Sequence, residues 1–420
     1  MIFLKPLWLG LLLIVVQNYN TVQGQPTKNN FLSGKSDSTH IIVSSNFDCG
    51  SIDTLKEVSP DFLLGKTKHW IQADNIGNQY YWFYFKLENV LDKVVTIKLT
   101  DMIGNYRGTI HTVYDNRTQP VYSYDQLHWE RISNVHYDKE RHVFVFTQKF
   151  INRAVWIAYA HPYPYSREEE FVSSLRSKPN ITITKLGSTK ESRDINLLTI
   201  TDNLIPDTVK KVVLITALQH SGEYTSGFIV EGMVDFLLSN DPVAIAARKE
   251  SIYKIVPMLN PDGIHNGMTR YNTNHEDLNT EWDDDTIDTI NTPVEPEVDC
   301  VKLWLRNWTK QGSPINMHID LHSQSQQGND NVMHMPKDGM LREFCTKLNN
   351  YFQMSYIPME FNGSATSVMN SEFHVPTTVF EITQSGIHDE PYLTIDNYKA
   401  YGEGIVKAFH DYIQSWGNGN

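Results

Sequence analysis

The chain has 420 residues, of which 40% are hydrophobic and 20% charged, and its formal net charge at pH 7 is −13. This composition is typical of a globular protein, and the length suggests two or three domains with ample core. The acidic balance argues against nucleic acid or an anionic membrane as the main partner.

Residues 1–24 have the pattern of a secretory signal peptide. Lys5 gives a positive start, an apolar run covers residues 7–16, and small residues occur at Val22 and Gly24. The run is too short to span a bilayer, which needs ~20 apolar residues. We therefore expect a secreted or periplasmic protein without stable membrane insertion after cleavage. Residues 25–39 are polar and predict a flexible lead-in.

Residues 40–163 predict an antiparallel β-sandwich. Short β-branched and aromatic runs alternate there with Gly, Asn and Asp turns, and few helical periods interrupt them. The strand-like runs are residues 40–45, 80–89, 94–102, 120–124, 142–150 and 154–160.

From residue 164 to 418 the pattern changes to strands alternating with longer helices. Such alternation predicts an α/β domain with a mixed, mostly parallel sheet that helices cover on both faces. The expected strands are residues 196–201, 211–218, 253–259, 315–322 and 377–383, and the clearest helices are 227–238, 298–308 and 399–416.

Polar residues follow four of these strands, and open α/β sheets place their sites at the carboxyl ends of strands. The endings hold His220 and Glu223, the Asn-Pro-Asp-Gly of residues 260–263, His322, and Glu381. A single strand followed by polar residues would carry little information. Four such strands, whose ends together hold two histidines and two glutamates, indicate a functional site.

A catalytic zinc site is the interpretation that these residues favour. His220 and Glu223 stand three residues apart on a glycine-containing turn that enters a helix. With His322 from another strand they make a His₂Glu set, which leaves a fourth zinc position open for water. The three cysteines, Cys49, Cys300 and Cys345, include no pair at metal-ligand spacing. We expect one Zn²⁺ per chain.

Amide hydrolysis needs two further groups. A carboxylate must accept a proton from water and pass it to the leaving nitrogen, and Glu381, at the end of an apolar strand, suits that role. A fixed cation must stabilise the oxyanion, and Arg270 is the candidate.

The motifs together resemble those of the zinc metallocarboxypeptidases of the carboxypeptidase A type. In the order of that family the chain carries Gly187-Ser188 through Arg193-Asp194, His-Ser-Gly-Glu at 220–223, Asn-Pro-Asp-Gly at 260–263, Arg270, Asp-Leu-Asn at 277–279, Glu-Pro-Glu at 295–297, His322-Ser323 and Glu381. The β-rich front region resembles that of the cytosolic-carboxypeptidase-like subfamily, which includes tubulin deglutamylases and bacterial relatives.

The resemblance implies a carboxypeptidase-like fold and a hydrolase that releases C-terminal residues, with glutamate as a candidate, from a peptide or protein substrate. It implies that Asp277 orients His220, that Asn279 binds the terminal carboxylate, and that Arg193 contacts a more distant subsite. The tyrosine that closes over substrate in the family has no clear counterpart, although Tyr356 and Phe361 lie near its expected position.

Thr280 departs from the family pattern, because it stands where an arginine normally grips the substrate's terminal carboxylate. A threonine hydroxyl cannot replace bidentate, charge-assisted bonds. A zinc amidase or isopeptidase acting on γ-glutamyl or peptidoglycan-type linkages therefore stays open. A further alternative is an inactive binding module in which the β-sandwich is the working part.

Overall fold

The computed structural model describes most of the chain from His40 onward. The expected signal peptide and lead-in lie outside the described residues. No helix within the described part has the length and apolarity needed to cross a membrane. The described residues are 40–73, 75, 77–106, 108–282, 295–326, 328, 330–336, 341–359, 364–387 and 392–417.

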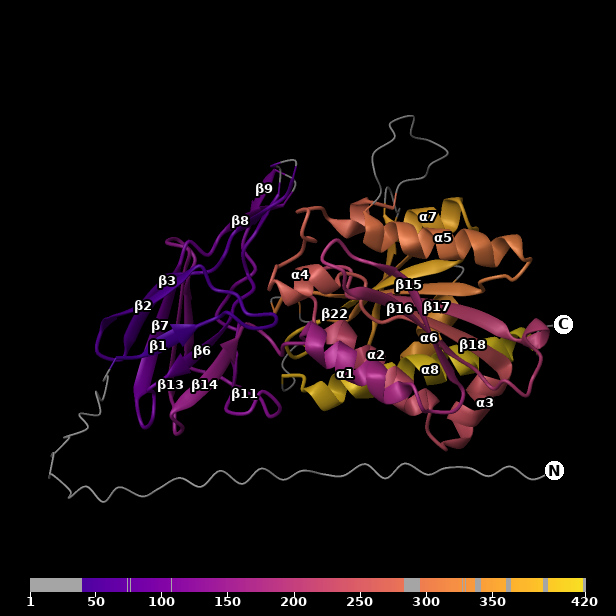
Figure 1. Cartoon of the computed structure of the whole chain (residues 1–420), viewed down its shortest axis with the longest axis horizontal. Coiled ribbons are helices and arrows are strands. Elements are labelled where there is room, and N and C mark those ends of the chain that lie inside the picture. The colour runs from indigo at the N-terminus through magenta and orange to yellow at the C-terminus, as the bar shows by residue number, and fades with distance from the viewer. Residues whose placement is uncertain are drawn as a thin grey trace, which may run out of the picture. The chain divides into compact units, whose positions relative to one another are not determined.

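The first part of the fold, here called the β region, consists of two five-stranded sheets and a small four-stranded sheet (Figure 1). The first sheet has the order β1(Ile42–Ser44)-β6(Tyr84–Glu88)-β14(Ala154–Ala158)-β10(Val121–Ser123)-β11(Glu130–Arg131). The second has the order β12(Val135–Asp138)-β13(Val143–Lys149)-β7(Val94–Thr100)-β3(Phe62–Lys66)-β2(Thr54–Ser59). The small sheet has the order β4(Trp70–Ile71)-β5(Asn78–Gln79)-β8(Gly104–Tyr106)-β9(Thr109–His111).

Alternating burial explains why these strands form a core. In β7 every second residue is buried, namely Val95, Ile97 and Leu99, while the residues between them are partly exposed. Phe83, the residue just before β6, stacks on Phe146 of the second sheet with ring centroids 6.0 Å apart. Pairing in these sheets is antiparallel except between β3 and β7. The expected β-rich front region is therefore present.

The second part, here called the α/β region, is built on an eight-stranded sheet. Its order is β15(Ile181–Ser188)-β16(Asp194–Ile200)-β18(Ser251–Val256)-β17(Lys211–Ala217)-β19(Met317–Ser323)-β22(Thr377–Ile382)-β20(Val332–Pro336)-β21(Ser355–Met359). The four central strands are parallel to one another, and antiparallel pairs lie on both sides of them. The predicted mixed sheet is confirmed.

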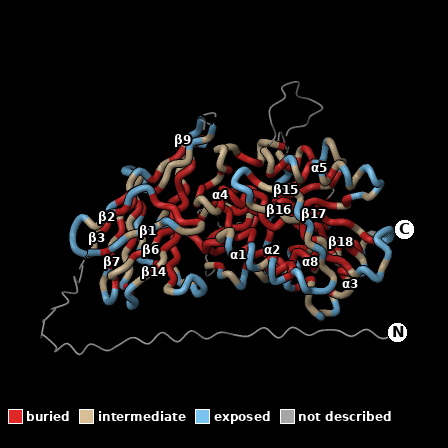
Figure 2. Tube along the Cα trace, in the orientation of Figure 1, coloured by how far each residue is buried: buried red, intermediate tan, exposed pale blue. Residues whose placement is uncertain are grey.

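Helices cover both faces of this sheet, as Figure 1 shows. In β17, Val213 and Ile215 pack into the same core as α2 and α8, whereas Val212 and Leu214 pack into a second core with α5 and α7. Both faces are buried (Figure 2), which explains the continuous apolar run in the sequence. The helices are α1(Tyr165–Leu175), α2(Thr225–Leu237), α3(Pro242–Glu250), α4(Pro261–His265), α5(Pro296–Lys310), α6(Arg342–Leu348), α7(Ala365–Ser371) and α8(Ile395–Gly417).

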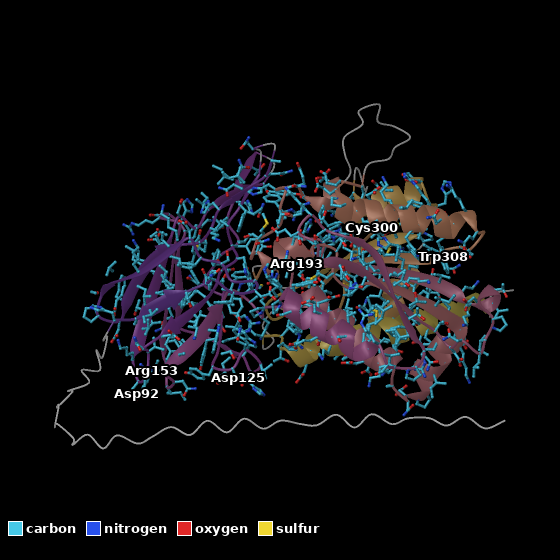
Figure 3. The ribbon with its side chains drawn as sticks, in the orientation of Figure 1. Asp92, Asp125, Arg153, Arg193, Cys300 and Trp308 are labelled. Atoms are coloured by element: carbon cyan, nitrogen blue, oxygen red, sulfur yellow. The ribbon has the colours of Figure 1, made fainter. Side chains whose placement is uncertain are left out.

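The three predicted helices correspond to α2, α5 and α8, each of which begins two to four residues before its expected start. In α5, Pro296 occupies the first turn, where its missing N–H costs nothing. The three cysteines form no disulfide; Cys49 and Cys345 are buried, and Cys300 on α5 is partly exposed (Figure 3).

Glycines allow α2 and α8 to cross at short range. A Cβ on Gly232 would lie 2.1 Å from the Lys399 carbonyl oxygen, and one on Gly402 would lie 2.1 Å from that of Ile229. Backbone therefore packs directly on backbone at this crossing. Because α2 follows immediately after Glu223, the crossing also fixes the turn that holds His220 and Glu223.

We predict that Gly232→Ala lowers the thermal midpoint, because the added methyl group overpacks the crossing at a cost of ~1–3 kcal/mol. Lys249→Ala, at an exposed position of α3, is the control and should change stability by less than ~0.5 kcal/mol. Thermal unfolding followed by circular dichroism measures both. Equal midpoints for the two variants would contradict the close-crossing argument.

Candidate active site

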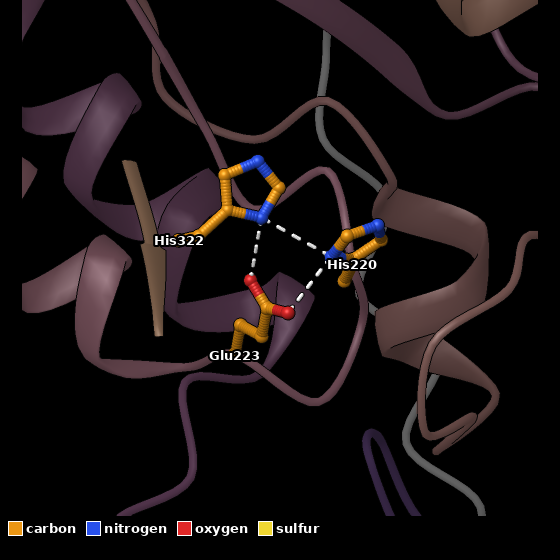
Figure 4. A group of neighbouring side chains, drawn as sticks. All are labelled: His220, Glu223 and His322. Carbon is orange, nitrogen blue, oxygen red and sulfur yellow. Dashed lines mark hydrogen bonds and ion pairs between the residues drawn. The ribbon is translucent and has the colours of Figure 1, made fainter. Parts of the chain in front are cut away.

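His220, Glu223 and His322 converge on one point (Figure 4). β17 ends at Ala217, and the chain then turns sharply at Leu218, whose φ is +54°. β19 runs parallel beside β17 with Ala217 opposite Leu321, so His322 lies next to the turn. The two oxygens of Glu223 lie 2.8 Å from Nδ1 of His220 and 2.8 Å from Nδ1 of His322. The two Nδ1 atoms are 3.1 Å apart.

The chemistry of these donors fits zinc. Ligands of a tetrahedral zinc at ~2.0–2.1 Å lie about 3.3 Å from one another, close to the separations seen here. Each imidazole also has a second carboxylate at its other nitrogen: Asp277 lies 3.0 Å from Nε2 of His220, and Asp320 lies 2.9 Å from Nε2 of His322. A carboxylate there favours the Nε2–H tautomer and leaves the Nδ1 lone pair for a metal. In the described part of the chain, no second group of three His, Cys, Asp or Glu donors converges in this way.

The surroundings keep the carboxylates of this cluster ionised. Burial opposes ionisation of Glu223, but the facing imidazoles of His220 and His322 hold its pKa well below the usual range. Asp277 is buried too, and Arg270 together with His220 likewise holds its pKa well below normal. Deprotonated ligands are the form that binds a metal.

Asp320 is a residue that motif reasoning missed. Besides His322, it accepts hydrogen bonds from the Thr216 hydroxyl at 2.7 Å and from the Gln219 amide at 3.2 Å. The sequence did carry a signal, because His318, Asp320 and His322 alternate along one strand and thus share one face.

Glu381 and Arg270 line a cavity of about 590 Å³ together with Glu223, which belongs to the zinc-ligand group of His220, Glu223 and His322. Glu381 lies on β22 directly opposite His322 in the parallel register, and burial together with the nearby Glu223 raises the pKa of Glu381 to about 7. Arg270 donates from Nε to Asp277 at 2.8 Å, which orients its guanidinium. The cavity is lined by Gln79, Tyr81, Tyr106, Thr109, His111, Val113, Glu223, Arg270, Ser323, Ser325 and Glu381.

The β region supplies part of this lining, which the sequence did not predict. The ring of Tyr106, on β8, lies 5.1 Å from the Arg270 guanidinium carbon, within cation–π range. The Tyr81 hydroxyl donates to the Thr269 carbonyl at 3.3 Å, beside Arg270. β8 and β9 are only three residues long, too short for a clear strand signal.

Three residues that the resemblance assigns to substrate binding or to its pattern, Asn279, Thr280 and Arg193, contact other parts of the protein. The Asn279 side chain accepts from the Ala365 amide at 3.2 Å, and the Thr280 hydroxyl donates to the Asp277 carbonyl at 2.8 Å. Arg193, labelled in Figure 3, donates to Asp262 at 2.7 Å and to Glu191 at 2.6 Å. None of the three lines the described cavity.

Tyr356 lies on β21 and does not line the described cavity either. Phe361, the other candidate for the closing position, falls outside the described residues. The structure therefore assigns the closing role to neither residue.

Comparisons with known proteins now identify the family. Residues 168–375 match the zinc carboxypeptidase family, and residues 43–160 match the family of cytosolic carboxypeptidase N-terminal domains. Cytosolic carboxypeptidase 6 of Mus musculus is 30% identical over 422 residues, which cover 92% of this chain and 75% of the mouse protein. The chain belongs to the zinc carboxypeptidase family. The human cytosolic carboxypeptidase 6 is 27% identical over 426 residues, covering 93% of this chain and 80% of that protein.

Solved structures agree on the fold. A metallo-carboxypeptidase from Burkholderia cenocepacia superposes with a TM-score of 0.78 at 21% identity, covering 90% of this chain and all of that chain. A carboxypeptidase A-like protein from Shewanella denitrificans gives 0.76 at 24% identity, covering 89% of this chain and 99% of that one. The predicted carboxypeptidase-like fold, the enzyme class and the zinc cofactor are confirmed, and the protein is a zinc metallocarboxypeptidase acting on peptide substrates.

We predict that Asp320→Asn weakens zinc binding by about 10–100-fold. An amide can donate to Nε2 of His322, which would favour the Nδ1–H tautomer and occupy the lone pair that the metal needs. Asp53→Asn, an exposed change in the β region, is the control. Competition for Zn²⁺ with a chromophoric chelator measures the affinity of each variant. Equal affinities would show that Asp320 does not set the tautomer.

Proposed function

We propose that this carboxypeptidase hydrolyses the C-terminal peptide bond with Glu381 as general base and Arg270 as oxyanion stabiliser. The proposal rests on one observation: Glu381 and Arg270 line a single cavity together with Glu223, which belongs to the zinc-ligand group of His220, Glu223 and His322. Zinc, when bound by these three residues, polarises the scissile carbonyl and acidifies a water molecule.

Glu381 is suited to moving a proton. Its pKa of about 7 lies near neutral pH, where a general base can both accept a proton from water and return it to the leaving nitrogen. Its carboxylate lies on the strand next to His322, so it faces the same point as the ligands.

Arg270 is suited to stabilising developing negative charge. The carboxylate of Asp277 holds the guanidinium through Nε, and the Tyr106 ring packs against it. A donor fixed before the reaction needs no reorganisation when the oxyanion forms. Asp277 contacts both Arg270 and His220, so we propose that this carboxylate couples the orientation of the cation to that of the zinc ligand.

We also propose a released residue, a cellular location and a domain boundary for this chain. The resemblance to a subfamily that includes deglutamylases supports C-terminal glutamate as the released residue. Residues 1–24 alone support secretion or export to the periplasm, whereas the relatives compared above carry the name cytosolic. We place the boundary between the two domains at residues 163 and 164, just before α1 begins.

An amidase or isopeptidase is the second candidate, and Thr280 is the observation that favours it. The described cavity contains no residue from the Asp-Leu-Asn-Thr segment, and Arg270 is the arginine in its lining. A substrate without a free terminal carboxylate would not need a second arginine, besides Arg270, to bind that carboxylate.

Glu381→Gln should reduce turnover by about 10²–10⁴-fold, because the amide cannot accept the water proton. Zinc content should stay unchanged, since Glu381 is not part of the ligand group. The control is Glu343→Gln, an exposed glutamate on α6. Release of glutamate from a peptide ending in that residue gives the rate, and atomic absorption gives the metal content. Full activity in Glu381→Gln would remove the proposed base.

A pair of peptides that differ only in a free or amidated C-terminus separates the two candidate reactions. We expect the zinc-loaded enzyme to trim only the free terminus, one residue at a time, and mass spectrometry reads the products. A zinc-chelated sample should trim neither. Cleavage of both peptides would establish the amidase reaction instead, and the departure at Thr280 would then mark a change of substrate.

A further inference from the structure

A second hollow, away from the residues of the active site, lies between α1 and β16. This groove has a volume of about 810 Å³, within the range of ligand sites, and its lining differs from that of the catalytic cavity. Four carboxylates line it, those of Glu168, Glu169, Glu170 and Asp194, against the single guanidinium of Arg176. The groove therefore favours a positively charged occupant.

Glu168 distinguishes this groove from an ordinary acidic surface. Only 3% of the residue is exposed, yet it lines the groove. Within the described part of the chain, its carboxylate has no hydrogen-bond or ion-pair partner. A buried carboxylate is costly unless it is paired or protonated. The side chain thus faces the groove without a counter-ion of its own.

The negatively charged neighbours of Glu168 make its ionisation in the empty groove still less favourable. Burial raises the pKa of Glu168 to about 8, and the negative charges of Glu169 on α1 and Asp194 on β16 act in the same direction. Asp194 has a partner of its own, Lys185 at 2.5 Å, and Glu169 interacts with the Tyr165 hydroxyl. Glu168 is the buried carboxylate that a cation entering the groove would reach.

We propose that this groove binds an alkylammonium group, with Glu168 as its buried counter-ion. A divalent metal fits less well, because within the described residues only the zinc-ligand group brings three donors together. Serine and asparagine side chains along the groove, Ser173, Ser192 and Asn196, can hydrogen-bond the rest of a ligand. The alkylammonium group belongs either to a lysine side chain of a polypeptide or to a free polyamine.

Binding must be linked to the loss of a proton. A cation stabilises the ionised form of Glu168, so a ligand that binds at pH 7 displaces the proton that the empty groove retains. Linkage then requires release of about one proton per ligand and an affinity that rises up to about tenfold per pH unit between pH 6 and 7.5. Above pH 8 the affinity should level off, because Glu168 is already ionised there.

Isothermal titration calorimetry on the zinc-loaded full chain tests the proposal with two probes, acetylated and amidated tetralysine and, separately, spermidine. Titrations at pH 7 in phosphate and in MOPS, whose ionisation enthalpies differ and neither of which is a primary ammonium ion, count the protons released. We expect at least one probe to bind with the proton release given above. The probe that binds identifies the source of the ammonium group.

Glu168→Gln should lower the affinity at least tenfold and abolish the proton release. This variant should fold normally, because Gln is close in shape to a protonated Glu; a circular dichroism melt checks this. Glu140→Gln makes the same change of charge on an exposed loop of the β region and should leave both quantities unchanged. Failure of both probes to bind, binding without proton release, or equal effects of the two variants would overturn the proposal. The outcome does not depend on the proposed roles of Glu381 and Arg270.

Discussion

The parallel register of β17, β19 and β22 is the constraint on which the active site depends. Ala217 lies opposite Leu321, and His322 lies opposite Glu381. The three strands therefore end at the same edge, and the residues that follow or terminate them meet there without any need for a long loop. A slip of one residue would turn His322 to the other face of the sheet. The buried apolar cores on both faces resist such a slip, because each strand residue packs on one side or the other.

The active site also concentrates several buried charges, most of which are paired with an opposite charge. Burying isolated charges is expensive, yet this cluster holds two imidazoles, an arginine and four carboxylates, Glu223, Asp277, Asp320 and Glu381, in little space. All but one of these carboxylates face a histidine or the arginine at hydrogen-bond distance. Glu381 is the exception, and burial together with the charge of Glu223 raises its pKa to about 7. The same arrangement that keeps the ligands ionised leaves one carboxylate able to exchange a proton.

The β region takes part in this site rather than standing apart from it. Tyr81, Tyr106 and His111 line the cavity, and the Cys49 thiol donates to the hydroxyl of Tyr224, the residue after Glu223, at 3.0 Å. Trp82 packs on the same Tyr224, with ring centroids 4.2 Å apart. These contacts link the β region to the turn that carries His220 and Glu223.

The sequence by itself determined the parts of this protein that consecutive residues encode. Apolar periodicity predicted the strand-rich front region and the helix-covered sheet. The polar residues at the ends of the predicted strands identified His220, Glu223, His322 and Glu381 as candidate site residues. Tertiary structure decided what depends on residues far apart in the chain. It placed Asp320 behind His322, engaged Arg193 with Asp262, brought β8 over Arg270, and buried Glu168 beside a groove. The physical reason is that periodicity and local spacing fix which face a side chain takes, whereas its partner across the fold is set only when separate elements pack together.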